Sequence, residues 1–244
     1  MANQYGLIGY PLGHSFSKKY FEEKFGKLQS SDAYSLFEMK KLAEFSTLIN
    51  TQKLSGLNVT IPYKQEIIEH LSTLDRSAKL VGAVNVIKIK GTDLEGYNTD
   101  YPAFKETLKK WLDNTNIKAL VLGTGGASKA VIAALQDLKI QSQLVSRNAS
   151  EKAISYEELA NNSNFLSDYK LVINTTPLGT SPKIDSKPEI PYQLLTPSHY
   201  LYDLVYNPEK TQFLKEGEKR GSHIKNGLEM LALQAELAWE IWNS

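Results

Sequence analysis

The chain has 244 residues, and its 28 lysines and arginines against 27 aspartates and glutamates leave a formal net charge of +1. Hydrophobic residues make up 41% and charged residues 23% of the chain, which excludes a disordered protein and predicts one large or two small domains with a real core. A charge so close to balance gives no field to hold a nucleic-acid backbone. The absence of cysteine excludes disulfide frameworks, thiolate metal sites and cysteine nucleophiles.

Targeting and membrane signals are also missing from the sequence. No run approaches the ~18 apolar residues of a membrane span, and the first residues lack the basic and apolar regions of a signal peptide. We therefore expect a soluble, cytoplasmic protein with no membrane partner. Nothing marks a large exposed apolar seam, so we expect a monomer or a weak homodimer.

The first hundred residues alternate short apolar runs with helical patterns. In chain order they predict a strand at 5–10, a helix at 18–28, a strand at 33–39, a helix at 42–49, a strand at 56–61, a helix from about residue 65, and strands at 83–89 and 94–98. Pro62 ends the third strand, and a turn at 90–92 joins the last two. This alternation predicts an α/β domain.

The pattern changes after a helix at 100–112 and a polar breaker at 113–116. Four apolar runs rich in β-branched residues follow, at 118–122, 143–146, 171–174 and 200–205, with a clear helix at 129–138. This spacing is typical of βαβ units in a parallel sheet, whose strands are buried on both faces. The amphipathic pattern at 228–242 predicts a final helix, which we expect to pack back on the first domain.

The strongest local signal is a glycine-rich turn between a predicted strand and a predicted helix. It comprises Gly123, Gly125, Gly126, Ala127 and Ser128. Glycine lets the backbone approach a dinucleotide pyrophosphate, and the following helix N-terminus presents free N–H groups to it. Ser128 departs from the last glycine of G-x-G-x-x-G, but its small neighbours keep the turn open. The turn therefore predicts a dinucleotide site.

The second strand of this region ends at Ser146 and Arg147. An NAD site would have an acidic residue here to accept a bond from the ribose 2′-hydroxyl. A guanidinium group suits a 2′-phosphate instead. We predict that the cofactor is NADP; the alternative is that Arg147 is a surface arginine.

Polar side chains follow three apolar runs of the first hundred residues. They are Ser15 and Ser17, then Asn58 and Thr60 with Lys64, then Asn85 with Asn98 and Asp100. Ligands of α/β sheets lie at the edge formed by the C-terminal ends of the strands. Hydroxyls and carboxamides suit a hydroxyl-rich small molecule there, because they both donate and accept hydrogen bonds. Taken singly, each is a helix cap, a turn residue or a solvated lysine. Their number and common placement favour a site.

Together these segments resemble the shikimate dehydrogenase family. The likeness runs through residues 9–17, 58–64, 82–85, 96–100, 123–128, 174–179, 203–208, 226–227 and Gln234. It implies a substrate-binding domain of residues 1–101 plus 228–244, and a Rossmann NADP-binding domain of residues 102–227. It also implies NADPH-dependent, reversible reduction of 3-dehydroshikimate to shikimate, a step of chorismate and aromatic amino acid biosynthesis.

The resemblance further implies roles for individual residues. Ser15 and Ser17 would hold the substrate carboxylate, and Lys64 and Asp100 would form the acid–base pair. The remaining substrate contacts would come from Asn58, Thr60, Asn85, Tyr206 and Gln234, and further cofactor contacts from Asn174, Thr175 and Gly227. This chain departs from the family's usual pattern at Lys18, where a proline is common. It also departs at Ser146 and Asn148, which flank Arg147 where the family has Asn-Arg-Thr.

Other readings of the sequence remain open. The histidines at positions 14, 70, 199 and 223 lack ligand-like spacing, so we expect no metal site. One alternative is a quinate/shikimate dehydrogenase that uses NAD, which Arg147 disfavours. Another is a non-catalytic protein that binds NADP or a metabolite, which the presence of both Lys64 and Asp100 disfavours.

Overall fold

The computed structural model describes residues 2–13 and 15–244 and divides into two compact units. Unit 1 comprises Met1–Thr99 and Gln234–Ser244, and unit 2 comprises Asp100–Leu233. The sequence analysis sets the boundaries at residues 101 and 228. Residues 100–101 group with unit 2 because the helix that starts unit 2 begins at Asp100, and residues 228–233 group with it because one continuous helix crosses the second boundary.

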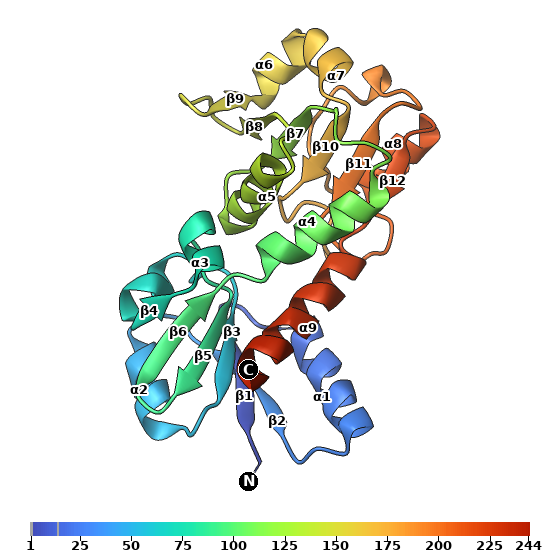
Figure 1. Cartoon of the computed structure of the whole chain (residues 1–244). Helices are drawn as coiled ribbons and strands as arrows, with labels where there is room; N and C mark the ends of the chain where they lie inside the picture. The colour runs from blue at the N-terminus through green and yellow to red at the C-terminus, as the bar shows by residue number, and fades with distance from the viewer. Residues whose placement is uncertain (1, 14) are drawn as a thin grey trace. The chain divides into compact units, whose positions relative to one another are not determined.

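Unit 1 is built on a mixed six-stranded sheet with the order β2-β1-β3-β5-β6-β4 (Figure 1). The strands are β1 Gln4–Gly9, β2 Ala33–Glu38, β3 Gly56–Val59, β4 Thr73–Leu74, β5 Val86–Lys90 and β6 Asp93–Tyr97. The helices are α1 Phe16–Leu28, α2 Glu44–Thr51, the 3₁₀ helix η1 Glu66–His70 and α3 Arg76–Val81. Strand β1 runs parallel to β2 and β3, whereas β5 runs antiparallel to both β3 and β6.

Both faces of this sheet are buried. Successive side chains of a strand point to opposite sides, so neighbouring residues of β1 pack in different clusters. Leu7 packs in a cluster with Phe21 of α1, and its neighbour Ile8 packs in a second cluster with Phe45 of α2 and Ile67 of η1. Helix α1 begins earlier than predicted, since Ser15 is its N-cap and accepts a bond from the Lys18 backbone N–H at 3.4 Å.

The helix predicted from about residue 65 is instead two short helices. The η1 helix ends at His70, strand β4 follows, and α3 starts after Asp75. The Asp75 carboxylate accepts bonds from the backbone N–H and the hydroxyl of Ser77, at 2.8 and 2.6 Å. This N-cap starts a new helix, a local signal that the helical period of the sequence conceals.

The last helix, α9 (Leu228–Asn243), joins the core of unit 1 through its C-terminal part. The Trp242 indole N–H donates to the Ile87 carbonyl at 3.1 Å, and its ring stacks on Tyr5 with centroids 4.7 Å apart. Ala235 and Ala238 are fully buried in the same cluster. These contacts place Gln234, which lies on the same helix, against the sheet of unit 1.

A substitution at Gly56 tests this packing, because a Cβ built there lies 2.3 Å from the Trp242 ring. We expect Gly56→Ala to lower the free energy of unfolding by about 1–3 kcal/mol, the usual result of overpacking. Urea unfolding measures it. Gly26→Ala is the matched control, since no described heavy atom outside the backbone of its own helix and its two chain neighbours lies within 4 Å of a Cβ there. Equal stability of wild type and Gly56→Ala would contradict the packing of Trp242.

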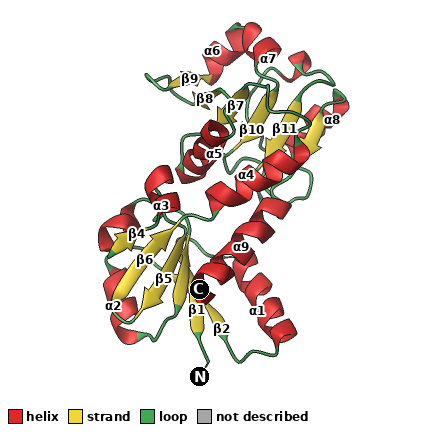
Figure 2. Ribbon diagram, viewed as in Figure 1, coloured by secondary structure: helices red, strands yellow, loops and turns green. Residues whose placement is uncertain are grey.

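Unit 2 contains a six-stranded sheet whose paired strands are all parallel, in the order β12-β11-β10-β7-β8-β9 (Figures 1 and 2). The strands are β7 Ala119–Leu122, β8 Ser142–Ser146, β9 Ala153–Ser155, β10 Leu171–Asn174, β11 Tyr200–Asp203 and β12 His223–Lys225. The helices are α4 Asp100–Trp111, α5 Gly126–Asp137, α6 Tyr156–Asn161, α7 Asn164–Asp168, the 3₁₀ helix η2 Tyr192–Leu194 and α8 Gln212–Lys219. Every residue of β7 and β10 is buried, so the interpretation of these runs as inner strands of a parallel sheet is confirmed.

His199 is a fully buried histidine at the edge of this core. The Thr196 backbone N–H donates to its Nδ1 at 3.0 Å, so Nδ1 carries no proton, and Nε2–H donates to the Leu166 carbonyl at 2.7 Å. Burial is the largest cause that lowers the pKa of His199 below 6.5. The structure therefore requires the neutral ring.

This environment predicts acid sensitivity. The unfolded chain binds a proton at His199 as the pH falls below about 6.5, while the folded chain resists it until its lower pKa is reached. The contribution of the neutral ring to the free energy of unfolding is therefore complete above pH ~6.5 and is lost as the pH falls below it. The loss is about 1.4 kcal/mol for each unit by which the folded pKa of His199 lies below the unfolded one. We expect His199→Gln to flatten the dependence of unfolding free energy on pH in this window, whereas His223→Gln, at an exposed histidine, leaves it in place. The same slope in wild type and His199→Gln would contradict this role.

Candidate functional site

Polar side chains gather at one edge of the sheet in unit 1. Asn58 lies in β3, and Thr60 follows the strand. Asn85 immediately precedes β5, and because β5 runs antiparallel to β3, its start lies beside the end of β3. The Val59 backbone N–H donates to the Asn85 carbonyl at 2.9 Å, which fixes this neighbourhood.

A row of buried hydrogen bonds connects three of the predicted substrate residues. The Asn58 Nδ2 donates to the Asn85 carbonyl at 3.4 Å. The Asn85 Oδ1 accepts from the Thr99 backbone N–H at 2.7 Å, and its Nδ2 donates to the Thr99 hydroxyl at 3.0 Å. The Thr99 hydroxyl donates to the Gln234 Oε1 at 3.5 Å. At the far end, the Tyr34 hydroxyl donates to the Asn58 Oδ1 at 2.7 Å. None of these five side chains belongs to a residue more than 8% exposed.

The two predicted carboxylate-binding serines lie at the start of α1. Ser15 is the N-cap of this helix, so its side chain stabilises the start of α1. Ser17 extends the row described above, since its hydroxyl bonds to that of Tyr34. Burial is the main cause that raises the pKa of Tyr34 above its usual value, and the Ser17 bond opposes this rise. His14, within the same sequence motif, lies outside the described residues.

The predicted acid–base residues occupy different units. Lys64 is half-buried in the turn after β3, and its carbonyl accepts from the Val84 backbone N–H at 2.7 Å. Thr60 is held at the head of this turn, because its backbone N–H donates to the Ile8 carbonyl at 2.9 Å. Asp100 is buried at the first position of α4, in unit 2. The pairing of Lys64 with Asp100 stays a prediction.

The predicted dinucleotide turn of unit 2 has the backbone that such a turn needs. Gly123 adopts φ +111°, a conformation that L side chains rarely adopt, and a Cβ there would lie 2.8 Å from the Thr175 hydroxyl. Gly125 is the N-cap of α5 and has no side chain to cover the helix end. The N–H groups of the first turn of α5 therefore remain for an anion.

The residues at this turn fit NADP. Arg147 is exposed just after β8, one strand away from the turn that follows β7. Gly126 and Ala127 are half-buried in the first turn of α5, and Ser146 donates its hydroxyl to the Asn148 carbonyl. The buried Ser128 hydroxyl donates to the Gly125 carbonyl at 2.6 Å, so it stabilises the turn itself.

A third polar group lies where β10 and β11 end. The buried Asp203 carboxylate accepts from Asn174 Nδ2 at 2.9 Å, from the Val205 backbone N–H at 3.0 Å and from the Thr211 hydroxyl at 2.5 Å. Burial raises the pKa of Asp203 to about 6 against the effect of these bonds. The Thr175 hydroxyl donates to the Leu122 carbonyl at 2.7 Å, which ties this loop to β7. Sequence reasoning assigned Asp203 no role, although a lone acid that ends an apolar strand is a detectable signal.

The two remaining predicted residues also lie in unit 2. Gly227 has no room for a side chain, because a Cβ there would lie 2.2 Å from the Leu204 carbonyl oxygen. Its backbone N–H donates to the Val205 carbonyl at 3.2 Å. Tyr206 is half-buried, and this burial raises its pKa. Both therefore belong to the loops that follow β11 and β12.

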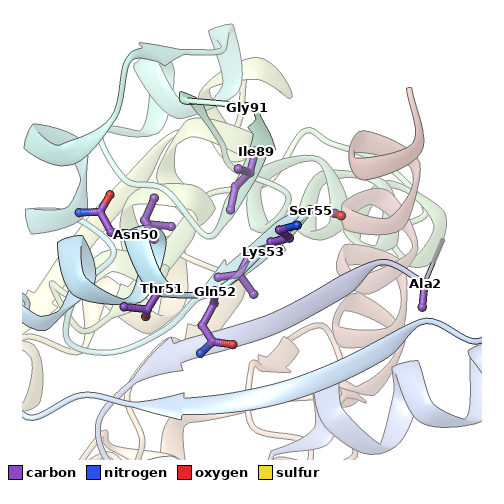
Figure 3. A pocket seen from close by; sticks show the side chains of 10 residues that line it. Ala2, Asn50, Thr51, Gln52, Lys53, Ser55, Ile89 and Gly91 are labelled. Atoms are coloured by element: carbon purple, nitrogen blue, oxygen red, sulfur yellow. The ribbon is translucent and has the colours of Figure 1, made fainter.

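Unit 1 also has a pocket of about 510 Å³ (Figure 3). It is lined by residues that flank the starts of β1 and β3 and the end of α2, with Lys53 as its charged side chain. Ser15 and Thr60, by contrast, follow the opposite ends of β1 and β3. None of the predicted substrate residues lines this pocket.

Two absences hold for the described part of the chain. It has no helix long and apolar enough to cross a membrane. It also has no group of three or more His, Asp or Glu side chains that could hold a metal ion.

Unit 2 has a parallel sheet with a glycine-capped helix directly after β7, and a second α/β unit accompanies it. This architecture is that of the two-domain dinucleotide-binding enzymes. A family model described as the shikimate dehydrogenase substrate binding domain matches residues 7–87. The chain belongs to the shikimate dehydrogenase family: a shikimate dehydrogenase (NADP+) of Clostridium beijerinckii is 41% identical over 247 residues, which cover 98% of this chain and 91% of that protein.

Solved structures agree with this membership. A chorismate mutase/shikimate 5-dehydrogenase fusion protein from Clostridium acetobutylicum superposes with a TM-score of 0.87 at 37% identity, over 100% of this chain and 92% of that one. Shikimate 5-dehydrogenase from Thermus thermophilus, in complex with NADP(H) and shikimate, gives 0.86 at 29% identity over 98% and 93%. The predicted fold class, an α/β substrate domain with a Rossmann domain, is thereby confirmed.

Proposed function

We propose that the protein catalyses the reversible, NADPH-dependent reduction of 3-dehydroshikimate to shikimate. The observation that carries this proposal is the likeness over 98% of the chain to a shikimate dehydrogenase (NADP+). Relatives with the same description from other organisms match over a similar share of the chain. The buried carboxamides of unit 1 and the turn before α5 supply matching chemistry, one for hydroxyl groups and one for a pyrophosphate.

Substrate binding falls to unit 1 in this proposal. Ser15 and Ser17 bind the carboxylate of the substrate with their hydroxyls. The substrate hydroxyls contact the carboxamides and one further hydroxyl, from Asn58, Thr60, Asn85 and Gln234. Uncharged groups suit this task because they orient hydroxyls without the desolvation that charged partners require.

Cofactor binding falls to unit 2. The pyrophosphate lies against the backbone at Gly123, Gly125 and Gly126, where the helix N-terminus favours negative charge. Arg147 binds the 2′-phosphate with its guanidinium fork. The nicotinamide end lies near the loops of Asn174, Thr175, Tyr206 and Gly227.

Proton transfer is the chemical task of the chain's own residues. NADPH supplies the hydride when bound. In the reduction, the Lys64 ammonium gives a proton to the oxygen that becomes a hydroxyl, and in the reverse direction its neutral amine takes the proton back. The Asp100 carboxylate accepts a bond from the same hydroxyl and orients the lysine. We further propose a cytoplasmic monomer or weak homodimer.

The experiment that tests this proposal follows NADPH absorbance with the purified chain and 3-dehydroshikimate. Parallel reactions contain NADH in place of NADPH and 3-dehydroquinate in place of 3-dehydroshikimate. We expect the fastest turnover with NADPH and 3-dehydroshikimate. Preference for 3-dehydroquinate with NADH would support a quinate/shikimate dehydrogenase, and NADPH binding without turnover would support a non-catalytic protein.

A further inference from the structure

Two members of the buried row in unit 1 have no role in the proposed function. They are Tyr34, in β2, and Thr99, which follows β6. Tyr34 is 4% exposed and Thr99 is 1% exposed. Each joins the row through its hydroxyl, and Thr99 also through its backbone N–H.

Tyr34 determines which way the Asn58 carboxamide is oriented. Its hydroxyl donates to the Asn58 Oδ1 at 2.7 Å, so the oxygen of this carboxamide is occupied. One hydrogen of the Asn58 Nδ2 is directed to the Asn85 carbonyl at 3.4 Å. A carboxamide carries two N–H groups, so the second one remains for a ligand.

Thr99 has the same effect on Asn85. The Asn85 Oδ1 accepts from the Thr99 backbone N–H at 2.7 Å, and one hydrogen of its Nδ2 goes to the Thr99 hydroxyl at 3.0 Å. The hydrogen of that hydroxyl has two acceptors within reach, the Asn85 Oδ1 at 3.3 Å and the Gln234 Oε1 at 3.5 Å. All three carboxamide oxygens thus have partners inside the protein.

We propose that Tyr34 and Thr99 are positioning residues of the substrate site, which hold the oxygens of Asn58, Asn85 and Gln234 on protein partners so that Asn58 and Asn85 meet the substrate as N–H donors. This inference rests on the proposed function. The substrate oxygens are then acceptors toward these two residues. Because the carboxamides are oriented before the substrate arrives, binding does not have to order them.

The aromatic ring of Tyr34 has a separate, structural task. It stacks on Phe21 with centroids 4.8 Å apart and an interplanar angle of 14°, and it lies 6.5 Å from the Trp242 ring. Tyr34→Phe keeps this packing and removes only the hydroxyl. The variant therefore separates the positioning role from the packing role.

The test measures KM for shikimate, KM for NADP+ and kcat in wild type, Tyr34→Phe, Thr99→Val and Thr99→Ser. Loss of a buried hydrogen bond predicts that Tyr34→Phe and Thr99→Val raise KM for shikimate roughly 5- to 50-fold. KM for NADP+ should stay unchanged, and kcat should fall less than KM rises. Thr99→Ser restores the hydroxyl, so its KM for shikimate should return toward that of wild type.

Tyr202→Phe is the matched control. The Tyr202 ring is fully buried in unit 2, and its hydroxyl bonds to that of Thr107 at 2.8 Å. This variant loses one buried hydroxyl, as Tyr34→Phe does, and should lower the melting temperature without changing KM for shikimate. Equal KM changes in Tyr34→Phe and Tyr202→Phe would mean that general loosening, not carboxamide orientation, is measured.

The outcomes separate this inference from the proposed function. A wild-type protein that does not oxidise shikimate with NADP+ overturns the proposed function, and the inference with it. An active wild type whose Tyr34→Phe and Thr99→Val variants keep a normal KM for shikimate overturns the inference alone. If Tyr34→Phe does not fold, the Thr99→Val and Thr99→Ser pair still decides the result, since it changes one hydroxyl.

Discussion

Lys64→Met is expected to lower kcat by about 10²- to 10⁴-fold, the usual contribution of a positioned acid–base group. Methionine keeps most of the apolar stem of the half-buried side chain and removes only the ammonium, so the turn after β3 should keep its fold. KM for shikimate should change far less than kcat, because the lysine acts mainly by transferring the proton in the chemical step. Initial rates of shikimate oxidation with NADP+ measure both constants.

Two further variants sharpen this result. Lys53→Met removes an exposed lysine from the pocket at the opposite edge of the same sheet, and its kcat should equal that of wild type. Asp100→Asn should both raise KM for shikimate and lower kcat. It weakens a contact with the substrate and also removes the carboxylate that orients Lys64. A Lys64→Met protein with wild-type turnover would show that another group moves the proton.

The inner strands of the unit 2 sheet could be predicted from the sequence because burial on two faces, complete in β7 and β10, produces continuous apolar runs. The run at 171–174 coincides with β10, and those at 118–122 and 143–146 differ from β7 and β8 by one residue. Short edge strands carry no such signal. Strands β9 and β12 have three residues each, too few for a period to emerge.

Helix boundaries were less predictable, for reasons that particular side chains explain. The helical period after residue 65 continues across Asp75, whose capping bonds to Ser77 begin a separate helix. Helix α6 starts at a capping box between Ser155 and Glu158, a pattern that is visible in the sequence.

Two members of the buried row in unit 1 could be found in the sequence, but the connections of the row could not. Asn58 lies near the end of an apolar strand and Asn85 directly precedes one, which marks both as candidates. Tyr34 lies within an apolar strand and has the appearance of an ordinary core residue. Its bond to Asn58 joins positions 24 residues apart, and the Thr99 contact with Gln234 joins positions 135 residues apart. Only the folded sheet brings such partners together.

Arg147→Ala is expected to raise KM for NADPH about 10- to 150-fold and to leave KM for NADH nearly unchanged. A hydrogen bond to a charged group contributes roughly 1.5–3 kcal/mol, which gives this range of affinity. Arg147 is exposed after β8, so a 2′-phosphate can reach its guanidinium. The melting temperature should therefore stay that of wild type.

The contrast between the two cofactors decides the role of Arg147. Lys152→Ala, at an exposed lysine in the turn between β8 and β9, removes one positive charge from the same segment and should leave both KM values near those of wild type. Added salt should weaken NADPH binding to wild type more than to Arg147→Ala, because screening acts on the charge pair that the variant lacks. If Arg147→Ala raises KM equally for NADPH and NADH, then the arginine supports the fold of the turn and does not read the 2′-phosphate.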